Sequence, residues 1–516
     1  MQFVRLRARL TYTRSLGMRL RLVHLLPVLA FCCATASEAA TYYVRNGGSD
    51  SADGRSHATA WASLGKINNH SFSPGDQVLL HEGHRWVGRV ELDWAGTSTA
   101  HAVLGAYYLD GSTPKRGYRT APPTIDGEDR LPTESKWTPL VLIRANRVRV
   151  ENLRVINSEG RGIGAASVSD PEVVGCSVSN IRSGGIHFLK TQGGRAENNR
   201  VTRTDAGYPE SGGTVDWGAA IAIVTSRSTV IRNNTVAEVW GEGINAHSGS
   251  QYTLIERNYV FGARSAGVYS DAAPDTTIRR NIIVGTANSS YWRNGSTVGP
   301  GIVLSNEVYH YPAGGGSQDV SIQSKRARIY GNLVANTSEG IGIWGGGFAE
   351  TSYDDMRIYN NTLVDNTIQV TMSTKPKPGA QFYNNILLSL SGGTTDISGL
   401  NLNGMTAKNN YFSKGDPGGG YSSSSNRYTG LELAKMSGWR AVNSPDQVSW
   451  RDFVVLSGSP VIGAGSDEPW QASTGDQDYR LDHNKAEFSL PMDMGGLTFA
   501  TPPGPRPMAP TALSGT

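Results

Sequence analysis

Residues 230–284 read VIRNNTVAEVWGEGINAHSGSQYTLIERNYVFGARSAGVYSDAAPDTTIRRNIIV, and they contain one pattern twice, followed by the start of a third copy. Asn234 recurs as Asn258 and then as Asn281, at spacings of 24 and 23 residues, and His247 and Asp271 are also 24 residues apart. A period of this length is typical of a solenoid, in which each coil packs its apolar face only against its neighbours. The spacing therefore predicts that His247 and Asp271 stack on adjacent coils.

The asparagine position extends the repeat far beyond this stretch. Its aligned members, most of them 23 to 25 residues apart, are Asn152, Cys176, Asn199, Asn234, Asn258, Asn281, Asn332, Asn361, Asn385 and Asn410. A short alternating strand precedes each member, and a second strand begins at a Gly-Ile or Gly-Val step. We predict an all-β chain, a parallel β-helix solenoid of about ten coils with caps at both ends. The asparagines form a structural ladder in it.

The second strand of each coil presents polar side chains outward. Its apolar residues alternate inward, so the residues between them face away from the core. The polar outward set is His187, Lys190, Asn245, His247, Tyr269, Asp271 and Glu307. Neighbouring parallel strands lie about 4.8 Å apart, so His247 and Asp271 are expected within hydrogen-bonding reach.

Surplus residues enter the coils around this polar strip. Two insertions precede the second strand, TDAGYPESGGTVDWG at 204–218 and TANSSYWRNGSTVGP at 286–300, and VYHYPAGGG at 308–316 follows it. Loops that project from a rigid scaffold often carry function. We expect them to wall a groove along the strip.

The strip suits β-elimination on an acidic polysaccharide. This reaction needs a cation to neutralise the uronate, a base for the C5 proton and an acid for the leaving oxygen. Lys190 or an arginine is the candidate cation, His247 oriented by Asp271 the base, and Tyr269 the acid, with His187 and Asn245 beside the substrate. A surface ladder pair is the alternative reading of His247 and Asp271.

Hydrolysis of a neutral glycan is a second hypothesis. Asp271 is third on its strand and Glu307 fifth on the next, which places their backbones about 8 Å apart and suits an inverting glycosidase. Glu242 lies five strand positions from Asp271, about 16 Å along the strand, which makes them a poor pair and favours a bend carboxylate.

A third hypothesis is a non-catalytic, polysaccharide-binding or adhesive β-helix. Aromatic faces suit the apolar faces of sugars, and the candidate stacking residues are Trp217, Tyr291, Trp292 and Trp344. Calcium is a possible cofactor at Asp271 with Asp275, or at Asp354 with Asp355, although neither pair has the ligand series of a calcium loop. We identify no other metal or cofactor motif.

The N-terminus has the pattern of a secretory signal peptide. Basic MRLRLVH precedes apolar LLPVLAFCCA and small-residue ATASEAA, with Met18 as an alternative start. Residues 1–40 hold six arginines and one glutamate, so their removal leaves 42 basic and 43 acidic residues and a net charge of −1. This balance does not favour nucleic-acid binding. We expect a secreted or periplasmic protein that has no membrane span after cleavage.

The remaining chain divides into four segments. We predict an N-terminal cap with the first strands at 41–125, the β-helix at 126–415, a C-terminal cap at 416–500 and a disordered Pro-rich tail at 501–516. Within the C-terminal cap, LELAKMSGWRAV at 431–442 has the pattern of a short amphipathic helix.

These segments also carry a family resemblance. The YYV strand at 42–44, the turn GSDSADG at 48–54, the strand PGDQVLL at 74–80 and the elements SGSPVIGAG and DMGGLTF near the C-terminus are similar to secreted bacterial right-handed parallel β-helix proteins of the pectate-lyase-like superfamily. The resemblance covers most of the mature chain. It implies a right-handed β-helix and a polysaccharide ligand, because the superfamily includes lyases, glycosidases, epimerases and binding proteins.

Overall fold

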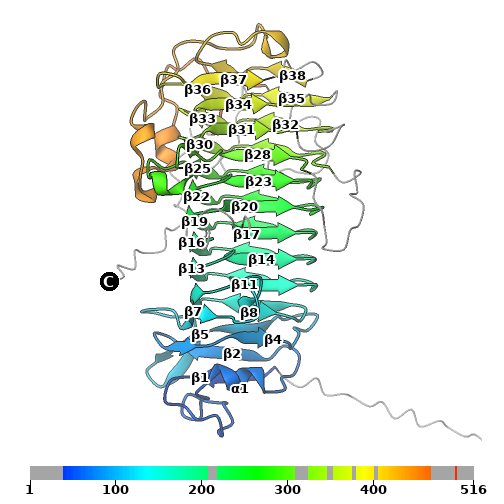
Figure 1. Ribbon diagram of the computed structural model, residues 1–516, viewed down its shortest axis with the longest axis vertical. Helices are drawn as coiled ribbons and strands as arrows, with labels where there is room; N and C mark the ends of the chain where they lie inside the picture. The colour runs from blue at the N-terminus through cyan, green and yellow to red at the C-terminus, as the bar shows by residue number, and fades with distance from the viewer. Residues whose placement is uncertain are drawn as a thin grey trace, which may run out of the picture. The chain divides into compact units, whose positions relative to one another are not determined.

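Three parallel sheets run through the chain, and each regular coil contributes one strand to each of them (Figure 1). The computed structural model describes residues 39–206, 218–293, 295–307, 323–345, 353–374, 379–399, 405–466 and 494–496. Residues 1–38 with most of the predicted signal peptide, Trp217, the 308–316 insertion and the predicted Pro-rich tail lie outside these residues. None of the described helices is long and apolar enough to cross a membrane.

The sheets have 14, 12 and 11 strands within the described residues. The first contains β1 (Thr41–Val44), β2 (Gln77–His81), β5 (Ala102–Asp110), β9 (Val148–Glu151), β12 (Glu172–Val174), β15 (Arg195–Glu197), β18 (Val230–Arg232), β21 (Leu254–Glu256), β24 (Thr277–Arg279), β29 (Arg328–Tyr330), β32 (Arg357–Tyr359), β35 (Ala380–Tyr383) and β38 (Met405–Lys408), with β6 (Thr113–Arg116) antiparallel to β5. The second contains β3 (Arg85–Val87), β7 (Thr124–Leu131), β10 (Arg154–Ser158), β13 (Ser177–Ile181), β16 (Arg200–Thr204), β19 (Thr235–Val239), β22 (Tyr259–Ala263), β25 (Ile282–Val284), β30 (Leu333–Ala335), β33 (Thr362–Val364), β36 (Ile386–Leu388) and β39 (Tyr411–Phe412).

The third sheet contains β4 (Val90–Leu92), β8 (Pro139–Ile143), β11 (Arg161–Ala166), β14 (Ile186–Leu189), β17 (Ala219–Val224), β20 (Glu242–His247), β23 (Val268–Asp271), β28 (Ile302–Ser305), β31 (Glu339–Ile343), β34 (Ile368–Met372) and β37 (Thr395–Gly399). A separate two-stranded ribbon pairs β26 (Trp292–Arg293) with β27 (Thr297–Val298). The parallel β-helix is therefore confirmed. A third strand, which the sequence analysis did not identify, directly follows each ladder asparagine, as Thr235–Val239 follows Asn234.

The asparagine ladder forms as predicted, with one register correction. From Asn199 onward, each ladder amide donates to the Oδ1 of the next, for example Asn234 to Asn258 and Asn258 to Asn281, both at 3.0 Å. Asn152 is not a member, because Gly175 is its neighbour and Cys176 follows Leu153 in the stack. Asn152 belongs to the preceding position, where the backbone is left-handed (φ 56° at Asn152 and 64° at Gly175).

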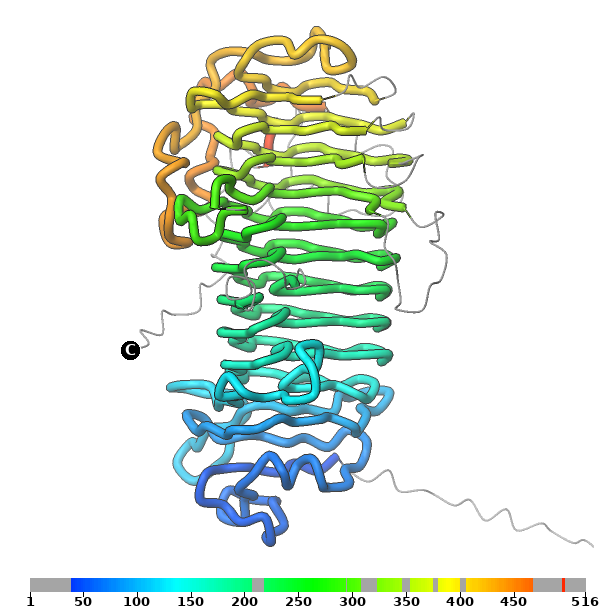
Figure 2. The backbone as a smooth tube through the Cα atoms, viewed as in Figure 1, coloured from blue at the N-terminus to red at the C-terminus, as the bar shows by residue number. Residues whose placement is uncertain are grey.

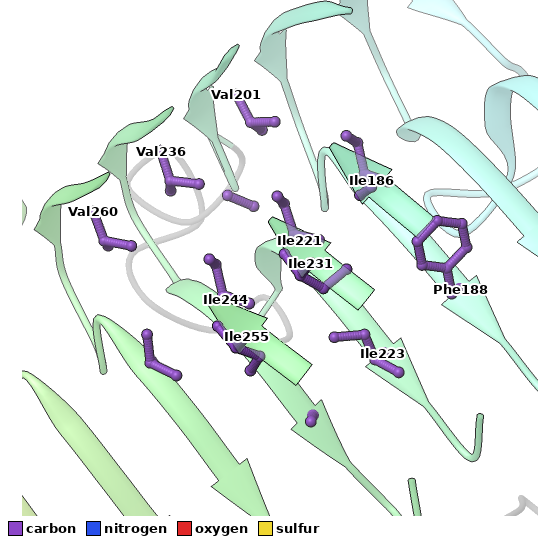
Figure 3. Close-up of a cluster of buried hydrophobic side chains, with 14 of the residues drawn as sticks. Ile186, Phe188, Val201, Ile221, Ile223, Ile231, Val236, Ile244, Ile255 and Val260 are labelled. Carbon is purple, nitrogen blue, oxygen red and sulfur yellow. The ribbon is translucent and has the colours of Figure 1, made fainter. Parts of the chain in front are cut away.

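Aliphatic side chains from all three sheets fill the interior of the coils (Figure 3). The labelled members include Ile186, Ile221 and Ile244 from the third sheet, Ile231 and Ile255 from the first, and Val201, Val236 and Val260 from the second. Inward and outward residues alternate as period-two burial requires. Stacked coils therefore share one continuous core, which Figure 2 shows as successive turns of the backbone.

A short helix and an aromatic cluster cover the N-terminal end of this core. Helix α1 (Leu64–Asn68) begins at Ser63, whose Oγ accepts a hydrogen bond from the Lys66 N–H at 3.1 Å. It buries Leu64 and Ile67 in the same cluster as Trp61. This helix thus covers the end of the first coil.

The segment at 431–461 packs on the outer face of the second sheet, beside β25 and β30 (Figure 1). The predicted helix at 431–442 is wrong: only Trp439–Ala441 is helical, as a single 3-10 turn. Leu431 and Leu433 are buried on either side of an exposed residue, which is the alternation of a strand, and Leu433 forms a bridge with Val455. The remaining short 3-10 turns are Ser289–Tyr291, Gly419–Tyr421, Pro445–Gln447 and Trp450–Phe453.

Candidate active site

The predicted polar strip lies on the outer face of the third sheet. Strand register places His247 beside Asp271 and Asn245 beside Tyr269 on adjacent coils, as the 24-residue period predicts. His187 lies on the same row as Asn245, two strands away, with Ala222 between them. The structure thus brings five of the predicted residues into one continuous surface.

Much of this strip is covered rather than open. His187, Asn245, Tyr269 and Asp271 are buried, whereas His247 is half-buried. Lys190, directly after β14, is exposed. Two of the three insertions expected to wall a groove, at 204–218 and 308–316, lie largely outside the described residues, so the groove stays a prediction.

The Glu242 side chain runs along its own strand and so reaches the polar strip. Its Oε2 accepts a hydrogen bond from Asn245 Nδ2 at 2.6 Å, so the side chain points forward toward His247 and Asp271. Burial, together with the charges of Asp271 and Glu307, raises the pKa of Glu242 to about 8. The expected separation of five strand positions therefore holds for the backbone but does not isolate the carboxylates. The sequence analysis interpreted Glu242 as a bend carboxylate and missed its electrostatic coupling to Asp271 and Glu307.

Asp271 and Glu307 contact each other in a way that strand counting did not predict. Strand β28 ends at Ser305, so Glu307 lies beyond the strand and is not its fifth residue. The Glu307 N–H donates to Asp271 Oδ1 at 2.7 Å. Asp271 is fully buried and Glu307 is exposed. The Asp271 carboxylate thus fixes the chain that presents Glu307 to solvent.

A second buried acid, Asp205, lies beside Glu242 and was missed from the sequence. Burial and the nearby Glu242 charge raise the pKa of Asp205 well above its usual value. Gly218 and Gly241 make room for it, because a Cβ at Gly218 would lie 1.6 Å from Asp205 Oδ1 and one at Gly241 would lie 2.9 Å from Oδ2. The sequence offered one signal that could have identified Asp205, which is its place as an acid at the start of the 204–218 insertion. Its contacts with Gly218 and Gly241 are visible only in the structure.

A cationic group occupies the other end of the strip. Arg161, which the sequence reasoning also missed, places Nη1 3.3 Å from His187 Nδ1. Burial, followed by the charge of Arg161, lowers the pKa of His187 well below its usual value and that of His247 to about 4. His247 Nδ1 also lies 2.9 Å from Ser248 Oγ. Both imidazoles are therefore neutral at neutral pH.

The candidate stacking residues have separate surroundings. Trp344 is half-buried; its ring centroid lies 6.2 Å from that of Tyr269, and its Nε1 donates to Glu339 Oε2 at 2.9 Å. Tyr291 is buried, 5.0 Å from the Trp240 ring centroid, and burial raises its pKa to about 12.

Trp292 follows Tyr291 in the 286–300 insertion and is anchored to its own loop. Trp292 is half-buried and donates through Nε1 to the Thr286 carbonyl at 2.6 Å. Trp217 lies outside the described residues. Trp344 is therefore the candidate stacking residue that lies nearest to the polar strip in the strand register.

The carboxylates considered for calcium have other partners. Asp275 pairs with Arg326 at 2.6 and 2.7 Å, and Asp355 pairs with Arg328 at 2.6 Å. Asp354 lies 3.8 Å from Lys325. Across the described ranges, no three His, Cys, Asp or Glu side chains gather as a metal site.

Two family models match the repeat region. One is described as a right-handed β-helix region and matches residues 134–283, and the other is described as a periplasmic copper-binding protein (NosD) and matches residues 212–417. Together with the three parallel sheets, the first match decides the handedness. The fold is a right-handed parallel β-helix. The family-model matches establish the fold, whereas any catalytic chemistry has to be inferred from the residues of the polar strip.

The chain is similar to several solved structures. The pectate lyase Pel9A is similar at 14% identity and a TM-score of 0.50, covering 89% of this chain and 96% of that one. An alginate lyase from Paenibacillus sp. str. FPU-7 is similar at 16% identity and a TM-score of 0.41, covering 57% and 91%. A lacto-N-biosidase from Eubacterium ramulus is similar at 14% identity and a TM-score of 0.42, covering 71% and 67%.

The described residues do not fit a copper ion. Copper sites use His, Cys and Met ligands. The region matched by the copper-binding family has no cysteine and two histidines, His247 and His310, of which His310 lies outside the described residues. Its methionines, Met356, Met372 and Met405, are packed in the hydrophobic core.

Proposed function

We propose that this β-helix is a secreted or periplasmic glycoside hydrolase whose general acid is Glu242. The observation that carries the proposal is the environment of Glu242: half-buried, held by Asn245 at 2.6 Å, and close enough to Asp271 and Glu307 that their charges raise its pKa. A carboxyl with a pKa of about 8 is protonated about nine times in ten at pH 7. It can therefore donate a proton under conditions in which an ordinary glutamate cannot.

Glu307 supplies the complementary base. Its carboxyl is exposed, and its backbone is held by Asp271. In the proposed reaction, Glu242 gives its proton to the glycosidic oxygen as the bond to the anomeric carbon breaks. A water attacks that carbon and passes a proton to Glu307, which inverts the configuration. Asp271 acts as a positioning residue.

The test is turnover by paired variants. Glu242→Gln and Glu307→Gln should each lower the release of reducing ends by about 100- to 10,000-fold, with glycan binding retained. Glu238→Gln is the control, because Glu238 lies on the same coil and pairs with Arg203 instead. Substrates are a panel of neutral and acidic polysaccharides, and NMR of the first product reports its anomeric configuration. Full activity of Glu242→Gln would refute the assignment.

β-Elimination on an acidic polysaccharide is the second candidate. Arg161 beside His187, together with exposed Lys190, could neutralise a uronate, with His247 as base and Tyr269 as acid. A histidine whose pKa is about 4 is a weak base, and Tyr269 is buried, so the geometry favours hydrolysis. Ultraviolet absorbance from unsaturated product ends would reverse this preference. Binding without any product would instead favour a polysaccharide-binding protein.

A further inference from the structure

An exposed aromatic side chain adjoins the cationic end of the strip. Trp137 lies two residues before the start of β8, whose Pro139 pairs with Arg161 on β11, and β11 pairs with the strand that carries His187 (Figure 1). Trp137 is 42% exposed. From β11, three inter-strand steps lead to the strand of Glu242, or about 14 Å along the solenoid.

Arg161 is held between the aromatic ring and the histidine. Its guanidinium carbon lies 4.8 Å from the Trp137 ring centroid, and its Nη1 is 3.5 Å from the Trp137 carbonyl and 3.3 Å from His187 Nδ1. Because the pKa of His187 is lowered, the imidazole stays neutral and Arg161 carries the positive charge. Lys136 Nζ lies 4.9 Å from the same ring centroid, and Lys190 is exposed on the strand end that follows His187.

The two ends of the strip therefore differ in charge. Arg161 and Lys136 both lie against the Trp137 ring at the N-terminal end, whereas Glu242 and Glu307 lie toward the C-terminal end. A guanidinium fork recognises carboxylates and sulfates, and an indole ring stacks on the apolar face of a sugar. The acidic end instead disfavours an anionic group at the point of cleavage.

We propose that Trp137, Arg161 and His187 form a subsite for a sugar that carries an anionic group, either a uronate carboxylate or a sulfate ester. The substrate is then a mixed glycan, with a neutral sugar beside Glu242 and an acidic one several units away. This inference rests on the proposed hydrolase for the location of the cleavage point. The binding of the acidic sugar itself does not depend on it.

The experiment uses the full chain with Glu242→Gln on a microarray of neutral, uronate-containing and sulfated oligosaccharides, followed by calorimetry on the bound members. We expect acidic glycans among those bound, and at least a tenfold weaker affinity for them when Arg161→Gln is added. Trp137→Ala should weaken neutral and acidic members alike. Raising the salt concentration should weaken only the acidic ones. Preference for carboxylate or for sulfate identifies the group, and either one supports the subsite.

A matched pair elsewhere on the molecule provides the control. Arg227 lies 4.6 Å from the ring centroid of Tyr252, which is 48% exposed, so Arg227→Gln and Tyr252→Ala remove the same kind of contact away from the strip. They should leave glycan binding unchanged. The subsite is overturned if no acidic glycan binds, or if a folded Arg161→Gln protein, checked by circular dichroism, binds acidic glycans normally. Hydrolysis that survives Glu242→Gln would overturn the proposed function but not this result.

Discussion

At the scale of single residues, one hydrogen bond gives Glu242 its chemical character. The amide of Asn245, three residues further along β20, draws the Glu242 carboxyl toward Asp271. That bond by itself lowers the pKa of Glu242, whereas burial and the two acids raise it, and the raising effects are larger. The result is a proton donor at neutral pH, which strand counting alone would have excluded.

The pH dependence of turnover should show this donor directly. Because Glu242 must be protonated to act, kcat/KM should fall about tenfold per pH unit above its pKa of about 8. Asn245→Ala removes a contact that lowers this pKa, so the alkaline limb should move to higher pH while activity falls. Rates measured from pH 5 to 10 check both. An alkaline limb unchanged by Asn245→Ala would show that another group sets it.

The asparagine ladder makes a residue-scale prediction about stability. Asn258 donates through Nδ2 to the Ile231 carbonyl and to Asn281 Oδ1, both at 3.0 Å, and is nearly fully buried. Asn258→Ala leaves these acceptors unsatisfied and should lower the free energy of unfolding by about 3 kcal/mol. Thr202→Ala, at an outward position of β16, should change it by less than about 0.5 kcal/mol. Denaturant unfolding followed by circular dichroism compares the two.

At the scale of elements, tertiary packing overrides local pattern in the C-terminal segment. Residues 431–442 have helical spacing, yet Leu433 and Trp439 are buried against the outer face of the second sheet. Gly438 adopts a left-handed conformation (φ 76°) immediately before Trp439, which interrupts any helix there. The outer apolar face of the sheet, including Leu333 and Ile386, supplies the partner that decides the conformation.

Because the 431–461 segment docks on the second sheet, removal of the Trp439 indole should destabilise that segment locally. Trp439 is fully buried, so Trp439→Ala should destabilise the segment by about 3–5 kcal/mol. Hydrogen exchange should then accelerate over 431–461, while the ladder strands of the same coils keep their protection. Uniform acceleration across all coils would indicate that the segment is part of the cooperative core instead.

At the scale of the whole molecule, coil stacking gathers acids that are far apart in the chain. Asp205, Glu242, Asp271 and Glu307 come from successive coils, yet their charges meet on one face of the third sheet. Arg161 reaches the same face from the N-terminal side. The solenoid thus converts a sequence period into a row of side chains along its axis, with cations at one end and carboxyls at the other.

The N-terminal cap makes a pH prediction at this scale. The ring of His81 lies 4.5 Å from that of His84 and 5.3 Å from that of His57. Burial and neighbouring positive charges lower the pKa of His57 and of His84. His84 Nδ1 also accepts the Asn46 N–H at 2.9 Å, which its protonated form cannot do.

A histidine pKa that is lower in the folded state gives stability above the unfolded value, near 6.5, which is lost as the pH falls. The cap should therefore loosen between about pH 6.5 and 5. Hydrogen exchange over 41–68, corrected for intrinsic rates, should show this loosening, and His81→Asn should reduce it. Equal protection at pH 5 and 7.5 would contradict the prediction.

The sequence by itself determined the repeat, the parallel β-helix, the inward and outward alternation and the adjacency of His247 and Asp271. These follow from periodicity, because each coil sees only its neighbours and a fixed spacing fixes the register. The tertiary structure decided the third strand of each coil, the extended form of 431–442 and the burial of the strip. It also brought Arg161 and Asp205 to the strip and turned Glu242 toward Asp271. Side-chain direction and burial depend on what packs above each position, and a one-dimensional period does not contain that information.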